Sequence, residues 1–184
     1  WPVRHWQKPL ARRAAARQLS GSSVIRASFC NGVLNMASEL PTVGFIGLGI
    51  MGRPMAGHLQ KAGYPLVLVD FDPPLPEELI AGGAQVRASG REVAETADII
   101  VLMVPDTPDV EIVLFAEDGV AAGLSAGKLV VDMSSISPSA TAEFASRINE
   151  LGCDYLDAPV SGGATRAISG ELTIMVGGPE AAFE

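Results

Sequence analysis

The sequence predicts an α/β fold with a doubly wound, mostly parallel sheet over residues 39–184. Three observations support this prediction. Short apolar runs of strand length alternate with longer stretches that have helical spacing. Most of these runs are apolar on both faces, as strands buried between two helical layers must be. The alternation predicts right-handed crossovers, with a ligand site beyond the carboxyl ends of the strands.

Seven segments have the length and apolar character of strands, and five segments between them have helical spacing. The strand candidates are 43–46, 66–70, 84–87, 99–104, 129–133, 155–159 and 172–176. The helix candidates are 51–62, 77–81, 91–97, 108–115 and 138–151, and a further helix is expected to start within 179–184. Helix 138–151 has clear boundary signals, because Ser137 can cap it, Pro138 occupies its first position and Gly152 follows its end.

Charge divides the chain into two parts. Residues 1–38 hold six Arg or Lys and no acid, whereas residues 39–184 hold seven Arg or Lys against twenty-one Asp or Glu, a net charge of −14. The acidic part has the size of one domain and argues against a nucleic-acid partner, which requires a cationic face. The chain's two cysteines are too few for a zinc site, and its longest strongly apolar run, 99–104, is too short to span a membrane. We therefore expect a soluble domain with no metal, nucleic-acid or membrane partner.

The basic segment 1–38 has two interpretations. Met36 precedes the first patterned residues, which favours residues 1–35 as upstream read-through and predicts a cytoplasmic protein. The alternative is an organellar transit peptide, because the segment is rich in Arg, Ala and Ser and residues 11–19 could form a short basic helix. That alternative would place the protein in the mitochondrial matrix.

The first strand candidate runs into a loop with G-x-G-x-x-G spacing. Gly47 permits a tight turn, Gly49 lets backbone N–H groups approach a pyrophosphate, and Gly52 lets the next helix pack close to the sheet. The N-terminus of that helix then favours the anion. The residues expected to bind a dinucleotide cofactor here are Gly47, Leu48, Gly49, Ile50, Met51 and Gly52.

An acidic residue follows at the distance expected for a ribose-binding carboxylate. Asp70 ends the second strand candidate, 18 residues beyond Gly52. Asp70 and Asp72 would bind ribose hydroxyls and repel a 2′-phosphate, and no arginine lies nearby in the sequence to accept one. The sequence therefore predicts a Rossmann-type domain that binds NAD, with NADP as the alternative cofactor, rather than a glycine-rich turn without a ligand.

Four different motifs occur in order along the chain, at 45–59, 103–105, 132–138 and 157–163. Together they resemble the signature of the β-hydroxyacid dehydrogenases, the relatives of 3-hydroxyisobutyrate and 6-phosphogluconate dehydrogenase. The resemblance covers residues 42–184. The Asp-Met-Ser-Ser form at 132–135 is most similar to members that reduce tartronate semialdehyde, whereas 3-hydroxyisobutyrate dehydrogenases more often show Asp-Ser-Ser-Thr.

The resemblance implies an oxidoreductase that interconverts a small 3-hydroxy acid and its semialdehyde. Tartronate semialdehyde and glycerate are the favoured pair, and 3-hydroxyisobutyrate is the alternative substrate. It implies that Asp70 binds the adenosine ribose, and that the adenosine and nicotinamide side of the cofactor is lined by Val104, Pro105, Asp109 and Ser135. The implied substrate-binding residues are Ser161, Gly162, Gly163 and Ser135.

One family feature has no counterpart in this sequence. The resemblance implies a lysine general acid within Gly-x-x-x-Lys-x-x-x-Asn, in an all-helical second domain, and nothing here fits that motif. Lys61 is expected at a helix end and Lys128 as a solvated charge. We therefore expect no catalytic residue in this chain, which would be an inactive piece of a longer, homo-oligomeric parent enzyme. A dinucleotide-binding module without catalysis is the alternative.

Five further side chains are expected to have structural roles. His58 would be a surface or packing residue, and Cys153 a small apolar residue at the start of a strand. Asp98 and Asp157 would bond local backbone. Arg53 would either reach a phosphate or remain solvated.

Overall fold

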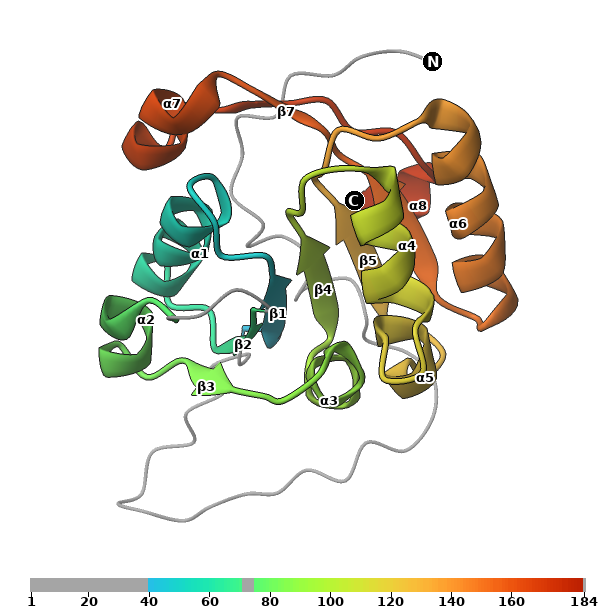
Figure 1. Cartoon of the computed structure of the whole chain (residues 1–184), viewed down its shortest axis with the longest axis horizontal. Coiled ribbons are helices and arrows are strands. Elements are labelled where there is room, and N and C mark those ends of the chain that lie inside the picture. The colour runs from blue at the N-terminus through green and yellow to red at the C-terminus, as the bar shows by residue number, and fades with distance from the viewer. Residues whose placement is uncertain (1–39, 71–74, 184) are drawn as a thin grey trace, which may run out of the picture.

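The computed structural model describes residues 40–70 and 75–183, and the predictions for residues 1–38 and Asp72 lie outside this part of the chain. Its main feature is a parallel sheet with strand order β3-β2-β1-β4-β5-β6 (Figure 1). The chain winds outward from β1 in one direction and then from β4 in the other, which confirms the predicted doubly wound fold. The strands are β1 (Val43–Ile46), β2 (Leu66–Val69), β3 (Gln85–Val86), β4 (Ile99–Leu102), β5 (Leu129–Asp132) and β6 (Asp154–Asp157).

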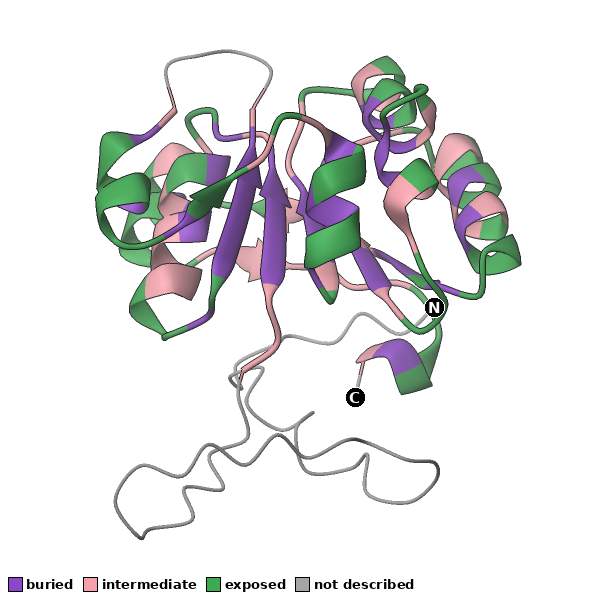
Figure 2. Cartoon of the chain, turned by 90° about the horizontal axis from the view of Figure 1, so that it is seen from below, coloured by how far each residue is buried: buried purple, intermediate pink, exposed green. Residues whose placement is uncertain are grey.

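Burial explains why the central strands are apolar throughout. Every residue of β1 and β2 is buried, and Figure 2 shows the strands enclosed between helices on both sides. The helices are α1 (Gly52–Lys61), α2 (Glu77–Ala81), α3 (Gly90–Thr96), α4 (Thr107–Phe115), α5 (Val120–Gly123), α6 (Pro138–Glu150), α7 (Gly163–Ser169) and α8 (Glu180–Phe183). Of these, α5 and α7 were not predicted from the sequence.

Two hydrophobic cores lie on opposite faces of the sheet. Because successive residues of a strand point to opposite faces, Ile46 belongs to one core and its neighbour Phe45 to the other. The first core includes buried side chains of α3, α4 and α6, and the second includes those of α1, α2 and α7. The helices contribute, in that order, Val93, Val110, Phe144, Met55, Leu79 and Ala167.

The seventh strand candidate, 172–176, is not part of the parallel sheet. Within it, β8 (Thr173–Ile174) pairs antiparallel with β7 (Val160–Ser161) in a separate two-stranded sheet. The pairing continues backward, since Met175 N–H donates to Pro159 O at 3.0 Å and Asp157 bridges Gly177. The chain therefore returns antiparallel along the extension of β6, and residues 172–176 do not add a further parallel strand beside β6.

Several element boundaries also differ from the prediction. β4 ends at Leu102 rather than at residue 104, because Val104 N–H donates to the side chain of Ser134 instead of to a neighbouring strand. Ser137 does precede α6, but its side chain bonds Ser139 Oγ at 2.8 Å and does not cap the helix. At α3 the side chain of Ser89 accepts the cap bond, so that helix begins one residue earlier than predicted.

Candidate functional site

The candidate site lies beyond the carboxyl ends of the strands, where the order of the sheet reverses between β1 and β4. Crevices at such switch points bind ligands in open α/β sheets. Four loops meet at this edge, following β1, β4, β5 and β6. The first three loops, and β7 and α7 beyond the fourth, contain residues that the sequence predicts to bind cofactor or substrate.

The glycines of the first loop fall into two kinds. Gly47 has φ +91°, and a Cβ there would lie 2.3 Å from Met103 O. A Cβ on Gly52 would lie 1.9 Å from Gly47 O, so both positions exclude any side chain. Gly49 differs, because a Cβ there would meet nothing within 4 Å. The space in front of Gly49 is therefore open.

Asp70 follows β2 and reaches back to the same loop. Its Oδ2 accepts a hydrogen bond from Leu48 N–H at 3.1 Å. The bond joins the second strand's end to the loop after the first strand, across 22 residues of sequence. Sequence spacing predicted a carboxylate near this loop, but it did not predict that the carboxylate binds the loop itself.

Four other predicted cofactor residues lie on the loops after β4 and β5 or at the start of α4. Pro105 and Ser135 are exposed, whereas Val104 is half-buried. Asp109 is half-buried in the first turn of α4, where an acid is favourable to the helix dipole. The structure thus brings these residues to the same edge as the glycine loop.

A buried polar network underlies these two loops. Asp132, the last residue of β5, accepts hydrogen bonds from Ser134 N–H at 2.9 Å and from Tyr155 O–H at 2.8 Å. Ser134 Oγ in turn accepts the bond from Val104 N–H at 3.1 Å. Sequence reasoning missed this network. The only available signal was an acid ending an otherwise apolar strand.

The network lowers the acidity of its members. Burial raises the pKa of Asp132, and the bonds from Ser134 and Tyr155 oppose this rise. Asp157 lies opposite Asp132 in the strand register, and burial, followed by the charge of Asp132, raises its pKa. Burial and then the neighbouring carboxylates raise the pKa of the Tyr155 phenol well above its usual value.

The predicted substrate residues lie on β7 and at the start of α7. Ser161, Gly162 and Gly163 are exposed, and both glycines have positive φ, of 135° and 65°. The far end of α7 is held by His58 on α1, whose Nε2 lies 3.0 Å from Ala167 O and 3.1 Å from Ile168 O. His58 therefore anchors α7 with a hydrogen bond, which the expectation of a surface or packing residue did not include.

One other expectation is wrong. Lys128 is half-buried and its Nζ donates to Ala94 O and Glu95 O at the end of α3, so it is not a freely solvated charge. Its ammonium satisfies carbonyls that the helix leaves open. Lys61 is exposed in the last turn of α1, as predicted.

The remaining side chains are structural. Arg53 pairs with Glu78 of α2 on the exposed surface. Asp98 accepts a bond from Thr42 N–H at 2.9 Å, so it bonds backbone as predicted, but backbone 56 residues away rather than local. Cys153 is buried beside β6, its Sγ donates to Ser125 O at 3.1 Å, and burial raises its pKa, as suits a packing residue.

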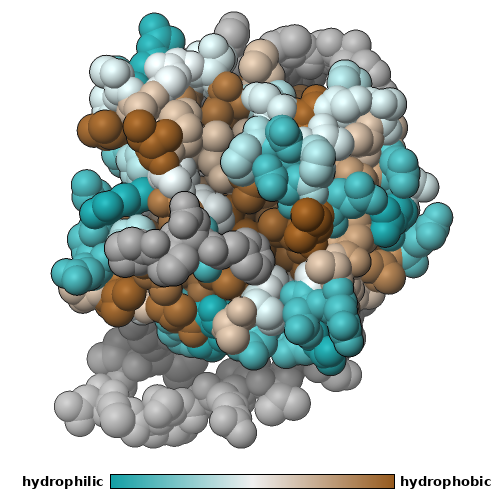
Figure 3. Space-filling model, in the orientation of Figure 1, coloured by the Kyte–Doolittle hydropathy of each residue, from teal (hydrophilic) through white to brown (hydrophobic). Residues whose placement is uncertain are grey.

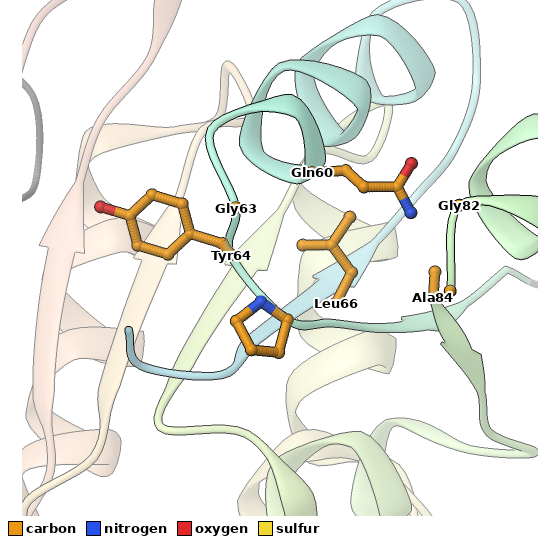
Figure 4. A pocket seen from close by; sticks show the side chains of 8 residues that line it. Gln60, Gly63, Tyr64, Leu66, Gly82 and Ala84 are labelled. Atoms are coloured by element: carbon orange, nitrogen blue, oxygen red, sulfur yellow. The ribbon is translucent and has the colours of Figure 1, made fainter. Parts of the chain in front are cut away.

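A pocket lies at the opposite end of the sheet (Figure 4). It is formed where α1 and α2 end and β2 begins, far from the glycine loop along the strands. Gln60 closes one side, with its Nε2 donating to Leu79 O at 2.8 Å. The lining residues are Gln60, Gly63, Tyr64, Pro65, Leu66, Gly82, Gly83 and Ala84. No predicted site residue is among them.

Over residues 40–70 and 75–183, no group of three or more His, Cys, Asp or Glu side chains could hold a metal ion. In the same described part, no helix is long and apolar enough to cross a membrane.

Residues 42–184 match a family described as the NAD binding domain of 6-phosphogluconate dehydrogenase. A 2-hydroxy-3-oxopropionate reductase of Escherichia coli is 56% identical over 142 residues, 77% of this chain and 48% of the relative. A mitochondrial 3-hydroxyisobutyrate dehydrogenase of Mus musculus is 46% identical over 149 residues, 81% of this chain and 44% of the relative. The chain thus spans about half the length of the curated relatives it matches.

Solved structures agree with this relationship. A crystal structure of 3-hydroxyisobutyrate dehydrogenase from Salmonella typhimurium matches with a TM-score of 0.72 and 41% identity, over 77% of this chain and 50% of that one. An imine reductase from Myxococcus stipitatus in complex with NADP+ matches with a TM-score of 0.62 and 27% identity, over 68% of this chain and 43% of that one. Its V8 variant in complex with NAD+ matches with a TM-score of 0.68 and 30% identity, over 78% and 48%. The chain therefore belongs to the β-hydroxyacid dehydrogenases, as an NAD-binding domain of that family.

Proposed function

We propose that this chain is the cofactor-binding half of a longer protein, called here the natural-length protein. We propose that this protein is an NAD(P)-dependent oxidoreductase that reduces tartronate semialdehyde to glycerate. The observation that carries the proposal is the open space at Gly49, at the switch point of the sheet, where a cofactor's pyrophosphate fits. The 56% identity to a 2-hydroxy-3-oxopropionate reductase favours this substrate among small 3-hydroxy acids and their semialdehydes. The cofactor, when bound, supplies or accepts the hydride.

Each loop at the sheet edge has one proposed task. The backbone of residues 47–52 holds the pyrophosphate, and Asp70 binds the adenosine ribose. Val104, Pro105, Asp109 and Ser135 line the adenosine and nicotinamide portions of the cofactor. The geometry supports this division, because the segments that follow β1, β2, β4 and β5 meet at one edge of the sheet.

Asp70 is proposed to favour NAD over NADP. Its carboxylate would repel a 2′-phosphate, and the bond from Leu48 N–H holds it against the glycine loop. A fixed charge discriminates better than a freely rotating one, because it cannot move away from the phosphate.

Substrate binding is proposed for the exposed segment Ser161, Gly162 and Gly163, together with Ser135 on the loop after β5. The hydroxyl of Ser161 and the N–H groups of the two glycines would hold the carboxylate or hydroxyl of the substrate. The proton donor is proposed to come from the part of the relatives that this chain does not span. Within the described residues, both lysines lie away from this edge: Lys128 donates to carbonyls at the end of α3, and Lys61 is exposed at the end of α1.

The second half of the enzyme is proposed to cover α7 and β8. Ile168 on α7 is 67% exposed and Met175, next to β8, is 37% exposed. Figure 3 shows apolar surface over the α7 end of the molecule. A helical domain packed there would complete the substrate site, and a homo-oligomer would assemble through that domain.

The proposal is tested with the purified natural-length protein, NADH and NADPH, and two substrates. We expect kcat/KM for tartronate semialdehyde to exceed that for the semialdehyde of 3-hydroxyisobutyrate by about tenfold or more. The reverse ratio would favour 3-hydroxyisobutyrate dehydrogenase, which the 46% identity to the mouse enzyme supports as the alternative. Reduction of neither compound with either cofactor would leave a dinucleotide-binding module without this activity.

A cytoplasmic location is proposed from the acidic, cysteine-poor residues 39–184 and from Met36 as a start. Cell fractionation of two natural-length forms, with and without residues 1–35, tests it. We expect both forms in the cytoplasm. Import of only the longer form into mitochondria would instead establish a transit peptide.

A further inference from the structure

Three hydrogen bonds form a continuous chain across the carboxyl edge of the sheet, from β6 through β5 to the loop after β4. Tyr155 O–H donates to Asp132 Oδ2, Ser134 N–H donates to Asp132 Oδ1, and Val104 N–H donates to Ser134 Oγ. The distances are 2.8, 2.9 and 3.1 Å. No other part of the proposed function uses Asp132, Ser134 or Tyr155.

The members of this chain are buried as deeply as the core. Asp132 is 0% exposed and Ser134 1% exposed, and they are the buried polar or charged side chains among the described residues apart from tyrosines. Burying such groups is costly unless every donor and acceptor is paired. Here both carboxylate oxygens and the serine hydroxyl have partners, so the arrangement has one well-defined geometry.

The bonds act where the strand ladder can no longer hold the backbone. The last ladder bonds between these strands are from Met133 N–H to Leu102 O and from Ala158 N–H to Asp132 O. Beyond them, the loop after β4 is joined to the loop after β5 by the bond between Val104 and Ser134. Residues on either side of this joint, Pro105 and Ser135, are exposed.

We propose that Asp132 and Ser134 are positioning residues, whose hydrogen bonds hold the loops carrying Val104, Pro105 and Ser135 at the spacing that the cofactor requires. This inference rests on the proposed function, because it takes those loops as the cofactor's lining. Tyr155 anchors the network by orienting the carboxyl group of Asp132. None of the three side chains needs to touch the cofactor.

The shape of the buried acceptor, rather than its charge, is expected to matter. Asp132 and Asp157 lie in register on neighbouring strands, and the pKa of each is raised by burial. An asparagine at position 132 would keep an oxygen for Ser134 N–H and could bond the Tyr155 oxygen through its amide. Asp132→Asn is therefore the conservative variant, and Ser134→Ala is the disruptive one.

The test compares the Kd for NADH with the melting temperature in the natural-length protein. Ser134→Ala leaves Val104 N–H without its acceptor, and we expect its Kd to rise about tenfold, equivalent to about 1.4 kcal/mol. Asp132→Asn should keep the Kd within about twofold of the unchanged protein. Amide hydrogen exchange at Val104, measured without cofactor, should accelerate in Ser134→Ala and not in Asp132→Asn.

Ile148→Val is the matched control, because Ile148 is fully buried in α6 and lies outside the network. It should lower the melting temperature without changing the Kd. An unchanged Kd in Ser134→Ala, or an equal rise in Ile148→Val, would overturn the positioning role while leaving the proposed function intact. If the unchanged protein binds neither NADH nor NADPH, the inference and the proposed function fail together.

Discussion

The two halves of the sheet's carboxyl edge are built by opposite means. On the side of β1, the loop 47–52 is shaped by missing side chains, since a Cβ at Gly47 or Gly52 would collide with backbone. On the side of β5 and β6, the loops are held by buried polar side chains, among them Asp132 and Ser134. One half leaves open space at Gly49, where we propose that a cofactor's phosphates bind, and the other is proposed to fix the position of the loops that face it.

The two halves are expected to respond differently to substitution. A side chain added to the glycine loop collides with backbone, and the resulting loss of stability is large and does not depend on pH. A buried polar network is weakened when a group loses its hydrogen-bond partner or changes protonation. The resulting loss of stability is smaller and depends on pH. Substitutions that separate these two behaviours therefore test the comparison.

The largest expected effect is on the glycine side. Gly52→Ala should lower the free energy of unfolding by about 3 kcal/mol or more, because its Cβ would lie 1.9 Å from Gly47 O. Gly49→Ala should change it by less than about 0.5 kcal/mol and yet weaken NADH binding at least about tenfold, since the space it fills is open. Urea unfolding and a cofactor titration measure the two quantities. Equal stability losses in both variants would show that the two glycines do not have separate tasks.

An intermediate effect is expected at Asp70, which bonds the glycine loop and is proposed to set cofactor choice. Asp70→Ala and Asp70→Asn both remove the charge, so both should shift the ratio of NADP to NAD affinity by about tenfold toward NADP. Only the alanine variant loses the acceptor for Leu48 N–H, so only it should also weaken binding of both cofactors. An unchanged affinity ratio in both variants would remove the role assigned to the carboxylate.

The smallest expected effect is on the network side and depends on pH. Because the folded-state pKa of Asp132 is raised above its unfolded value near 3.8, its contribution to stability is fully present below that value and is lost as pH rises through the folded pKa. Asp132→Asn has no such loss. Its free energy of unfolding, relative to the unchanged protein, should therefore increase as the pH rises from 4 to 7. A relative decrease over that range, measured by urea unfolding, would mean that the folded state favours the charged form.

The same contrast explains what could be predicted from the sequence. The glycine loop is read from local spacing, and the six parallel strands from apolar runs, so both were predicted. The network joins Asp132 to Tyr155 and Val104 to Ser134, pairs that are 23 and 30 residues apart. Their meeting depends on the register of three strands, which no local pattern encodes.

The errors in the predicted fold have a similar cause. Residues 172–176 have strand character, but their antiparallel return along the extension of β6 is decided by tertiary pairing with residues 157–161. His58 meets α7 across more than a hundred residues of sequence, so its hydrogen bonds could not be foreseen. Lys128 was expected in solvent because a lysine after a glycine carries no signal for the distant end of α3.

Hydrogen exchange of the natural-length protein, with and without NADH, tests most directly the claim that both halves of this edge bind one cofactor. We expect NADH to slow amide exchange in the glycine loop 47–52 and in the loops around Val104 and Ser135, with little change at the pocket near Gln60 and Gly82. Protection confined to that pocket, or no protection at the carboxyl edge under saturating NADH, would contradict it.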